Sequence, residues 1–199
     1  MRKVDLHIHS IYSDGVSTVE ESIKSAIDKG FDVVGISDHS FTLFDTSYCM
    51  RSEDYQKYVD EINLLKEKYK DKITIYCGIE QDYYSKADTS SFDYTIGSVH
   101  YIKADDIYIP VDETKDILLN ATEKYFNGNI YELIDAYYEN VANIAFKTSC
   151  DIIGHIDLIS KFNENGELFD ETDKRYISSY QKACDELLKS NILFEINTG

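Results

Sequence analysis

Six side chains in this sequence have the chemistry and the placement expected of metal ligands. They are the chain's five histidines and one glutamate: His7, His9, His39, Glu80, His100 and His155. Each lies at or just beyond the end of a stretch whose apolar pattern predicts a β-strand. Imidazole and carboxylate groups together favour zinc, iron or manganese, and six of them exceed what one tetrahedral ion uses. The pattern therefore predicts a centre with more than one metal ion, as in phosphoesterases whose ions share a carboxylate.

Short apolar strands alternating with amphipathic helices are expected to position these residues. Thr18 and the two glutamates that follow it mark a helix start, and Gly30 marks its end. The alternation predicts an α/β fold with a parallel sheet, and a βα barrel more than a doubly wound sheet, because no glycine-rich phosphate loop follows the first strand. In a barrel, residues at the C-terminal ends of the strands converge on one mouth. The expected strands are 3–9, 32–37, 73–79, 92–99, 151–154 and 192–196, and the expected helices are 18–29, 52–70, 114–126, 130–147 and 172–190.

Length and charge limit the classes of function. A chain of 199 residues accommodates one domain with a substantial core. The formal net charge of −17 argues against partners such as nucleic acid or an anionic membrane, since like charges repel. A phosphate-bearing substrate would then need a local positive charge, and bound metal ions supply one.

The cysteines and the N-terminus bear on the cellular compartment. Cys49, Cys77, Cys150 and Cys184 are widely spaced and form no CxxC pair, which argues against a zinc ribbon or a thioredoxin-type site. The sequence shows no apolar signal segment and no stretch long enough to span a membrane. Free thiols without an export signal predict a cytoplasmic protein.

Five motifs, in order, resemble those of the PHP (polymerase and histidinol phosphatase) family. DLHIHSIYSDG resembles the opening motif, ISDH the second and GIEQDY the third. SFDYTIGSVHYI and CDIIGHIDLISKF resemble segments of the histidinol-phosphatase branch in particular. The resemblance covers nearly the whole chain and implies a single PHP domain over residues 1–199. It also implies a distorted seven-stranded βα (TIM-like) barrel that holds two to three divalent metal ions, either zinc, manganese or iron.

The resemblance also implies a role for each ligand. His7, His9 and Glu80 would hold a first metal, and Glu80 would bridge to a second metal completed by His100 and His155. Glu80, His100 and His155 would thus be catalytic residues, because they would hold the ions that activate the attacking water. His39 would bind a third metal with Asp14 as its partner, although the Ser-Asp-Gly sequence around Asp14 is also typical of an ordinary turn.

Other polar residues near these motifs keep two interpretations. Asp5 and Asp38 are neighbours of ligand histidines and would orient them, or Asp38 only caps a turn. Lys161 is either a phosphate contact or a solvated lysine. Ser98 hydrogen-bonds either the substrate or its own turn.

The chain departs from the family at its end. The family closes its metal site with a late Asp-x-His motif, and none follows residue 155 here. We therefore expect the chain to lack two ligands and the last strand–helix unit of the barrel. The expected activity is hydrolysis of L-histidinol phosphate, a small phosphate ester, in histidine biosynthesis. The alternatives are a PHP phosphoesterase with another phosphorylated substrate, and an inactive metal-binding PHP domain; the oligomeric state is left open.

Overall fold

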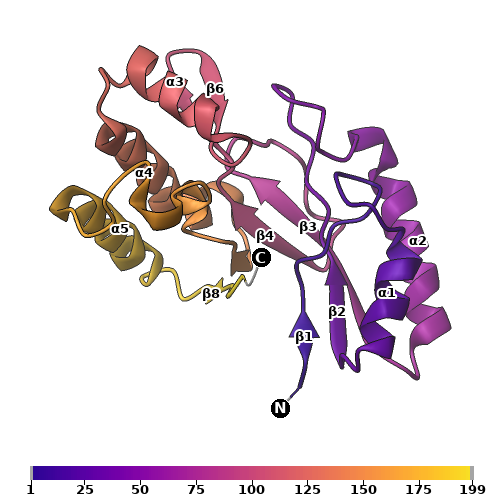
Figure 1. The fold of residues 1–199 in the computed structure, drawn as a ribbon. Coiled ribbons are helices and arrows are strands. Elements are labelled where there is room, and N and C mark those ends of the chain that lie inside the picture. The colour runs from indigo at the N-terminus through magenta and orange to yellow at the C-terminus, as the bar shows by residue number, and fades with distance from the viewer. Residues whose placement is uncertain (1, 198–199) are drawn as a thin grey trace. The chain divides into compact units, whose positions relative to one another are not determined.

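A computed structural model describes residues 2–197 of the chain. It divides into two compact units, residues 1–96 and residues 97–199 (Figure 1). Strand β4 (Tyr94–Ser98) runs through the boundary between them.

The first unit is a parallel sheet with two helices packed against it. Strands β1 (Val4–Asp5), β2 (Val33–Ile36) and β3 (Thr74–Asp82) follow one another in the sheet, and the start of β4 comes next to β3. Both β1–β2 and β2–β3 pair in parallel. Helix α1 (Val19–Asp28) packs against β2, and α2 (Tyr55–Tyr69), which a 3-10 turn precedes, packs against β3 (Figure 1). As predicted, Thr18 caps α1 in a capping box with Glu21.

A tyrosine ring lies over two glycines inside this unit. A Cβ atom added at Gly35 would come 2.1 Å from the Oη of Tyr94, and one added at Gly78 would come 2.2 Å from its Cζ. The Tyr94 hydroxyl donates a hydrogen bond to the carbonyl of Leu6, beyond the end of β1. Glycine is therefore required in β2 and in β3 so that one side chain from β4 can cross both strands.

The second unit combines a hairpin, three helices and two short parallel strands. Strands β5 (Tyr101–Ala104) and β6 (Ile107–Pro110) pair antiparallel, and α3 (Lys115–Tyr125) packs against β6. Helix α4 (Ile130–Thr148) packs against α5 (Lys174–Leu187), burying Leu133, Tyr137 and Tyr138. Strand β7 (Ile152–Ile153) follows the end of β4 in the sheet and pairs in parallel with β8 (Leu193–Phe194).

The predicted α/β class with a parallel sheet is confirmed, whereas some strand lengths were wrong. The strand expected over 3–9 is only Val4–Asp5, since the chain then turns and the Asp5 carboxylate accepts a hydrogen bond from the amide of His7. The third strand is longer than expected and includes Glu80, because Glu80 forms a parallel bridge with His39 beyond the end of β2.

The β5–β6 hairpin was not predicted. It connects through Asp105 and Asp106, and Asp105 has a φ of +52°, a conformation that Asp tolerates better than most residues. Two acidic residues between two alternating apolar stretches were the available signal. The hairpin is closed at its base by a hydrogen bond from the amide of Val111 to the carbonyl of His100.

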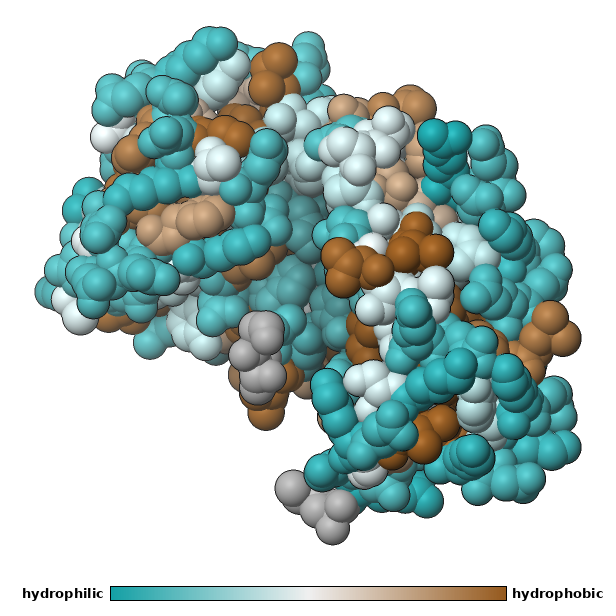
Figure 2. All heavy atoms as spheres, turned by 45° about the vertical axis from the view of Figure 1, so that its right-hand side comes forward, coloured by the Kyte–Doolittle hydropathy of each residue, from teal (hydrophilic) through white to brown (hydrophobic). Residues whose placement is uncertain are grey.

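The surface is mostly hydrophilic on the face shown in Figure 2, with separate apolar patches. Some large apolar side chains are almost fully exposed, among them Val16 at 96% and Leu43 at 86%. Among the helices of residues 2–197, none has both the length and the apolar character needed to cross a bilayer.

The packing of Tyr94 leads to a test of the fold. Gly78→Ala should lower the free energy of unfolding by about 1–3 kcal/mol, because the added methyl group overlaps the tyrosine ring. Urea denaturation measures this change. Tyr94→Ala removes the ring, so Gly78→Ala should cost clearly less in that background; equal costs in the two backgrounds would contradict the overlap.

Candidate metal centre

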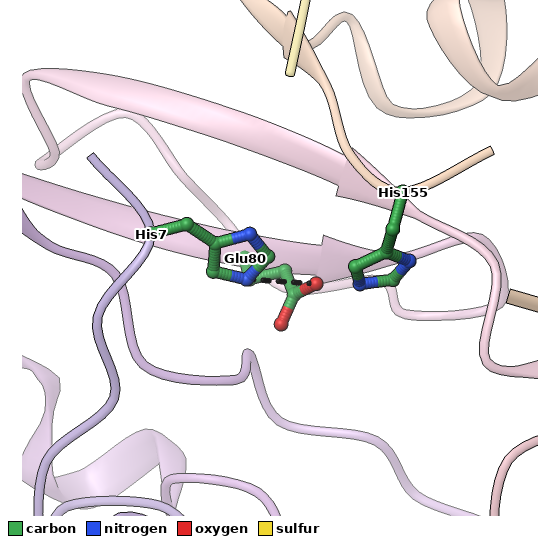
Figure 3. Close-up of side chains that lie close together, drawn as sticks. All are labelled: His7, Glu80 and His155. Carbon is green, nitrogen blue, oxygen red and sulfur yellow. Dashed lines mark ion pairs between the residues drawn. The ribbon is translucent and has the colours of Figure 1, made fainter. Parts of the chain in front are cut away.

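Three imidazole rings surround one buried carboxylate in the first unit. Glu80 lies near the end of β3 and its side chain is 0% exposed. His7 Nε2 lies 3.1 Å from Glu80 Oε1, the ion pair drawn in Figure 3. The Nε2 of His9 and the Nδ1 of His39 lie 3.1 Å and 2.9 Å from Glu80 Oε2. A carboxylate so enclosed needs a positive charge beside it, because burying an unpaired charge is costly.

The spacing of these groups fits a metal ion. Donor atoms of His9, His39 and Glu80 all lie within 4.8 Å of one another. Ligands at about 2.1 Å around a tetrahedral zinc ion are roughly 3.4 Å apart, which is close to the separations seen here. Imidazole and carboxylate are also the ligand types that zinc, manganese and iron accept. The residues therefore fit a divalent cation.

Asp14 joins this cluster from the loop after His9. Its Oδ1 lies 2.8 Å from His9 Nδ1, and its Oδ2 lies 3.7 Å from His39 Nε2. Hydrogen bonds from His39 and His9 hold the pKa of Asp14 well below its usual range, so it is ionised at neutral pH. Burial lowers the pKa of His9, but hydrogen bonds to Asp14 and Glu80 outweigh it and raise that pKa from 6.5 to about 9.

Asp5 and Asp38, the aspartates near the candidate ligand histidines, accept hydrogen bonds from nearby segments of the chain. Asp5 accepts a hydrogen bond from the main chain of His7, and Asp38 binds the turn that contains Ser10 and Ser13. Tyr48 lies edge-on to the His39 ring, with ring centroids 4.9 Å apart, and was not predicted. No spacing in the sequence marks Tyr48, because it comes from a loop without regular structure.

The second unit carries the other two histidines. His100 follows β4 and His155 follows β7, and their ring centroids are 5.1 Å apart. His155 lines a pocket of about 300 Å³, and Lys161, which also lines it, forms an ion pair at 3.6 Å with Asp112. The lining residues are His155, Asp157, Leu158, Ser160, Lys161 and Asn197. Ser98 is 1% exposed at the end of β4.

The structure thus groups the predicted ligands within each unit. Five lie together in the first unit: His7, His9, Asp14, His39 and Glu80. His100 and His155 lie together in the second, and Lys161 shares a pocket with His155. Figure 3 also draws His155, on the segment after β7. The assignment of each residue to a first, second or third metal stays a prediction.

Comparisons with known proteins place this arrangement in a family. The family model described as the PHP domain matches residues 5–199. The chain belongs to the PHP domain family. The histidinol-phosphatase of Bacillus subtilis is 27% identical to this PHP chain over an alignment 220 residues long, which covers 96% of the chain and 78% of that protein.

Two solved structures share the fold of the PHP chain. A Listeria monocytogenes protein assigned as a histidinol phosphatase matches with a TM-score of 0.80 and 21% identity, over 99% of the chain and 83% of its own. The histidinol phosphate phosphatase of Lactococcus lactis matches with a TM-score of 0.69 and 23% identity, over 99% of the chain and 73% of its own. The Lactococcus structure is a complex with zinc, L-histidinol and phosphate.

The raised pKa of His9 predicts that the melting temperature depends differently on pH with and without metal. In metal-free protein the raised pKa of His9 adds stability that is complete below about pH 6.5 and is lost as the pH rises through about 9. Metal competes with this proton, so its affinity should rise over the same interval. We therefore expect the melting temperature of chelator-treated protein to fall between pH 7 and 9, and that of zinc-loaded protein to hold or rise. Parallel pH profiles of the two forms would contradict a metal bound by His9.

Proposed function

We propose that this protein is a metal-dependent phosphomonoesterase that hydrolyses L-histidinol phosphate to histidinol and phosphate, a step of histidine biosynthesis. The observation that carries the proposal is the buried Glu80 carboxylate with three imidazole nitrogens within 3.1 Å. Membership of the PHP domain family and the histidinol-phosphatase relatives support the substrate. The zinc, histidinol and phosphate bound by the Lactococcus protein support a metal-dependent reaction.

Hydrolysis transfers the phosphoryl group to water. The water oxygen attacks phosphorus, the bond from phosphorus to the alcohol oxygen breaks, and the alcohol takes up a proton as it leaves. Divalent ions supply the main chemistry here, because they lower the pKa of water and offset the charge on phosphate oxygens. The chain's own contribution is to hold His7, His9, His39 and Glu80 in fixed positions, which reduces reorganisation during the reaction.

The number and identity of the metals are part of the proposal. We infer two to three ions of zinc, manganese or iron. His7, His9 and Glu80 serve the first and His39 with Asp14 the third. The role of Glu80, His100 and His155 as catalytic ligands of a bridged second ion stays a prediction from the family resemblance.

Lys161 is the cation proposed to contact the substrate phosphate. It lines the same pocket as His155, and its ammonium group faces Asp112 at a distance of 3.6 Å, long for a strong ion pair. A phosphate dianion would compete well for such a lysine. Ser98 stays a second candidate for substrate binding, from the end of β4.

The remaining expectations concern the architecture and setting of the enzyme. A distorted seven-stranded βα barrel in a single PHP domain is part of the proposal, supported by the TM-score of 0.80 with the Listeria protein. A cytoplasmic location without nucleic-acid or membrane partners is supported by the formal charge of −17 and by four free cysteines.

Phosphate release from L-histidinol phosphate tests the activity directly. With manganese or zinc, the wild-type protein should release phosphate from this ester faster than from nucleotides or phosphotyrosine. Glu80→Gln should lower turnover at least about 100-fold, because a neutral amide, which is a weaker metal ligand, replaces the carboxylate that three histidines face. Glu61→Gln is the matched control, since Glu61 accepts a hydrogen bond from Tyr12 outside the cluster. Near-normal turnover by Glu80→Gln would refute the role of this carboxylate.

Lys161→Ala tests the phosphate contact separately. Removal of a charged hydrogen-bond donor to phosphate should raise KM about tenfold or more. The metal content should change by a smaller factor than KM. Lys115→Ala is the control, because Lys115 forms an ion pair with Glu167 and does not line the pocket. Equal kinetics of Lys161→Ala and the wild type would mean that Lys161 is only a solvated side chain.

A further inference from the structure

Asp38 is a fully buried carboxylate whose hydrogen bonds all run to one short loop. It is 0% exposed and directly precedes His39. Its Oδ1 accepts hydrogen bonds from the amide of Ser10 at 2.8 Å, from the amide of Ser13 at 3.0 Å and from the Ser13 hydroxyl at 2.5 Å. Its Oδ2 accepts one from the Ser10 hydroxyl at 2.7 Å. These four donors offset the cost of burying the charge.

The loop bound by Asp38 is folded tightly back on itself. The carbonyl of Ser10 accepts hydrogen bonds from the amides of Ser13 and Gly15 at 3.1 Å and 3.0 Å. A Cβ atom at residue 15 would lie 2.5 Å from the carbonyl carbon of His9, so only glycine allows this approach. The loop therefore encloses the Asp38 carboxylate and has little freedom to move around it.

This loop carries Asp14 into the cluster. Asp14 immediately follows Ser13, and its carboxylate lies between the rings of His9 and His39. His9 precedes the loop and His39 follows Asp38, so both rings are attached to the segments that Asp38 joins. The main chain of Asp38 is in turn fixed to β3, because its carbonyl accepts a hydrogen bond at 3.0 Å from the amide of Glu80.

We propose that Asp38 is a positioning residue that sets the place of Asp14 through the loop, so that Asp14 and His39 can share an ion. The inference rests on the metal centre proposed above. The hydrogen bonds of the Asp38 carboxylate run to Ser10 and Ser13, and the effect on the metal passes through the loop: through its main chain and through the Ser13 hydroxyl, which lies 3.4 Å from Asp14 Oδ1. Simple capping of a turn would leave the metal affinity independent of this carboxylate.

Metal titration of four variants separates position from charge. Asp38→Ala removes all four hydrogen bonds, and Ser10→Ala removes the one from the Ser10 hydroxyl while it keeps the buried charge and leaves the Ser13 hydroxyl beside Asp14 in place. Asp38→Asn removes the charge but keeps the shape, since its amide oxygen accepts from the same donors and its NH₂ can donate to the Ser10 hydroxyl. Tyr12→Phe is the matched control in the same loop, because the Tyr12 hydroxyl binds Glu61 instead.

The Mn²⁺ affinity of each variant is measured by calorimetric titration of the chelator-treated full chain. Elemental analysis checks the number of bound ions. We expect Asp38→Ala to weaken the binding of the most loosely held ion about 10- to 100-fold and Ser10→Ala to weaken it less. The Mn²⁺ affinities of Asp38→Asn and Tyr12→Phe should stay within about threefold of that of the wild type. A change this small is distinguishable from the loss expected for Asp38→Ala. Excess Mn²⁺ should restore metal occupancy in Asp38→Ala.

Other outcomes contradict the proposal. Folded Asp38→Ala and Ser10→Ala with unchanged Mn²⁺ affinity would overturn it, and so would an Asp38→Asn protein as impaired as Asp38→Ala, because charge would then be the cause. If Asp38→Ala does not fold, Ser10→Ala decides together with Gly15→Ala, which shifts the loop by the overlap with His9. A wild-type protein that binds no Mn²⁺ would refute the proposed metal centre itself, a result distinct from equal binding by wild type and variants.

Discussion

The first unit depends on one buried negative charge. Glu80 is 0% exposed, and a carboxylate removed from water is stable only when positive groups or hydrogen-bond donors surround it. Three imidazole rings, two from one segment and one from a second segment about 30 residues later, meet this need. Their convergence requires that β1, β2 and β3 keep their register, since a shift by one residue would turn Glu80 to the opposite face. The position of the Glu80 carboxylate among the histidines and the register of the strands therefore depend on each other.

The clustering of the candidate metal ligands could be predicted from the sequence because strand ends are easy to recognise and histidines are few. His7, His9 and His39 follow apolar stretches, and the strands that carry them must be neighbours in a parallel sheet. The prediction of Glu80 as a ligand also needed only its place after an apolar run. The length of β1 could not be read in this way, because alternation continues through His9 although the hydrogen bonds of the strand end at Asp5.

Features without a clear local signal in the sequence were harder to predict. The β5–β6 hairpin has only two aspartates as a turn signal, without the glycine that usually marks such a loop. The hydrogen-bond partners of Asp38 could not be predicted for a different reason. Ser10 and Ser13 are 28 and 25 residues away, and small polar residues next to an aspartate are common in ordinary turns. Only the three-dimensional arrangement shows that the turn encloses the carboxylate.

The tight loop around Asp38 has a consequence for ion selectivity. Because the loop is held by hydrogen bonds of its own, the entropy lost in ordering Asp14 is lost when the chain folds and not when an ion arrives. A cation that fits the existing spacing of nitrogen and oxygen atoms therefore binds without further ordering of the chain. A cation of larger radius, such as calcium, must displace the loop and break bonds to Asp38. The rigidity of six residues, 10–15, thus favours small divalent ions over calcium.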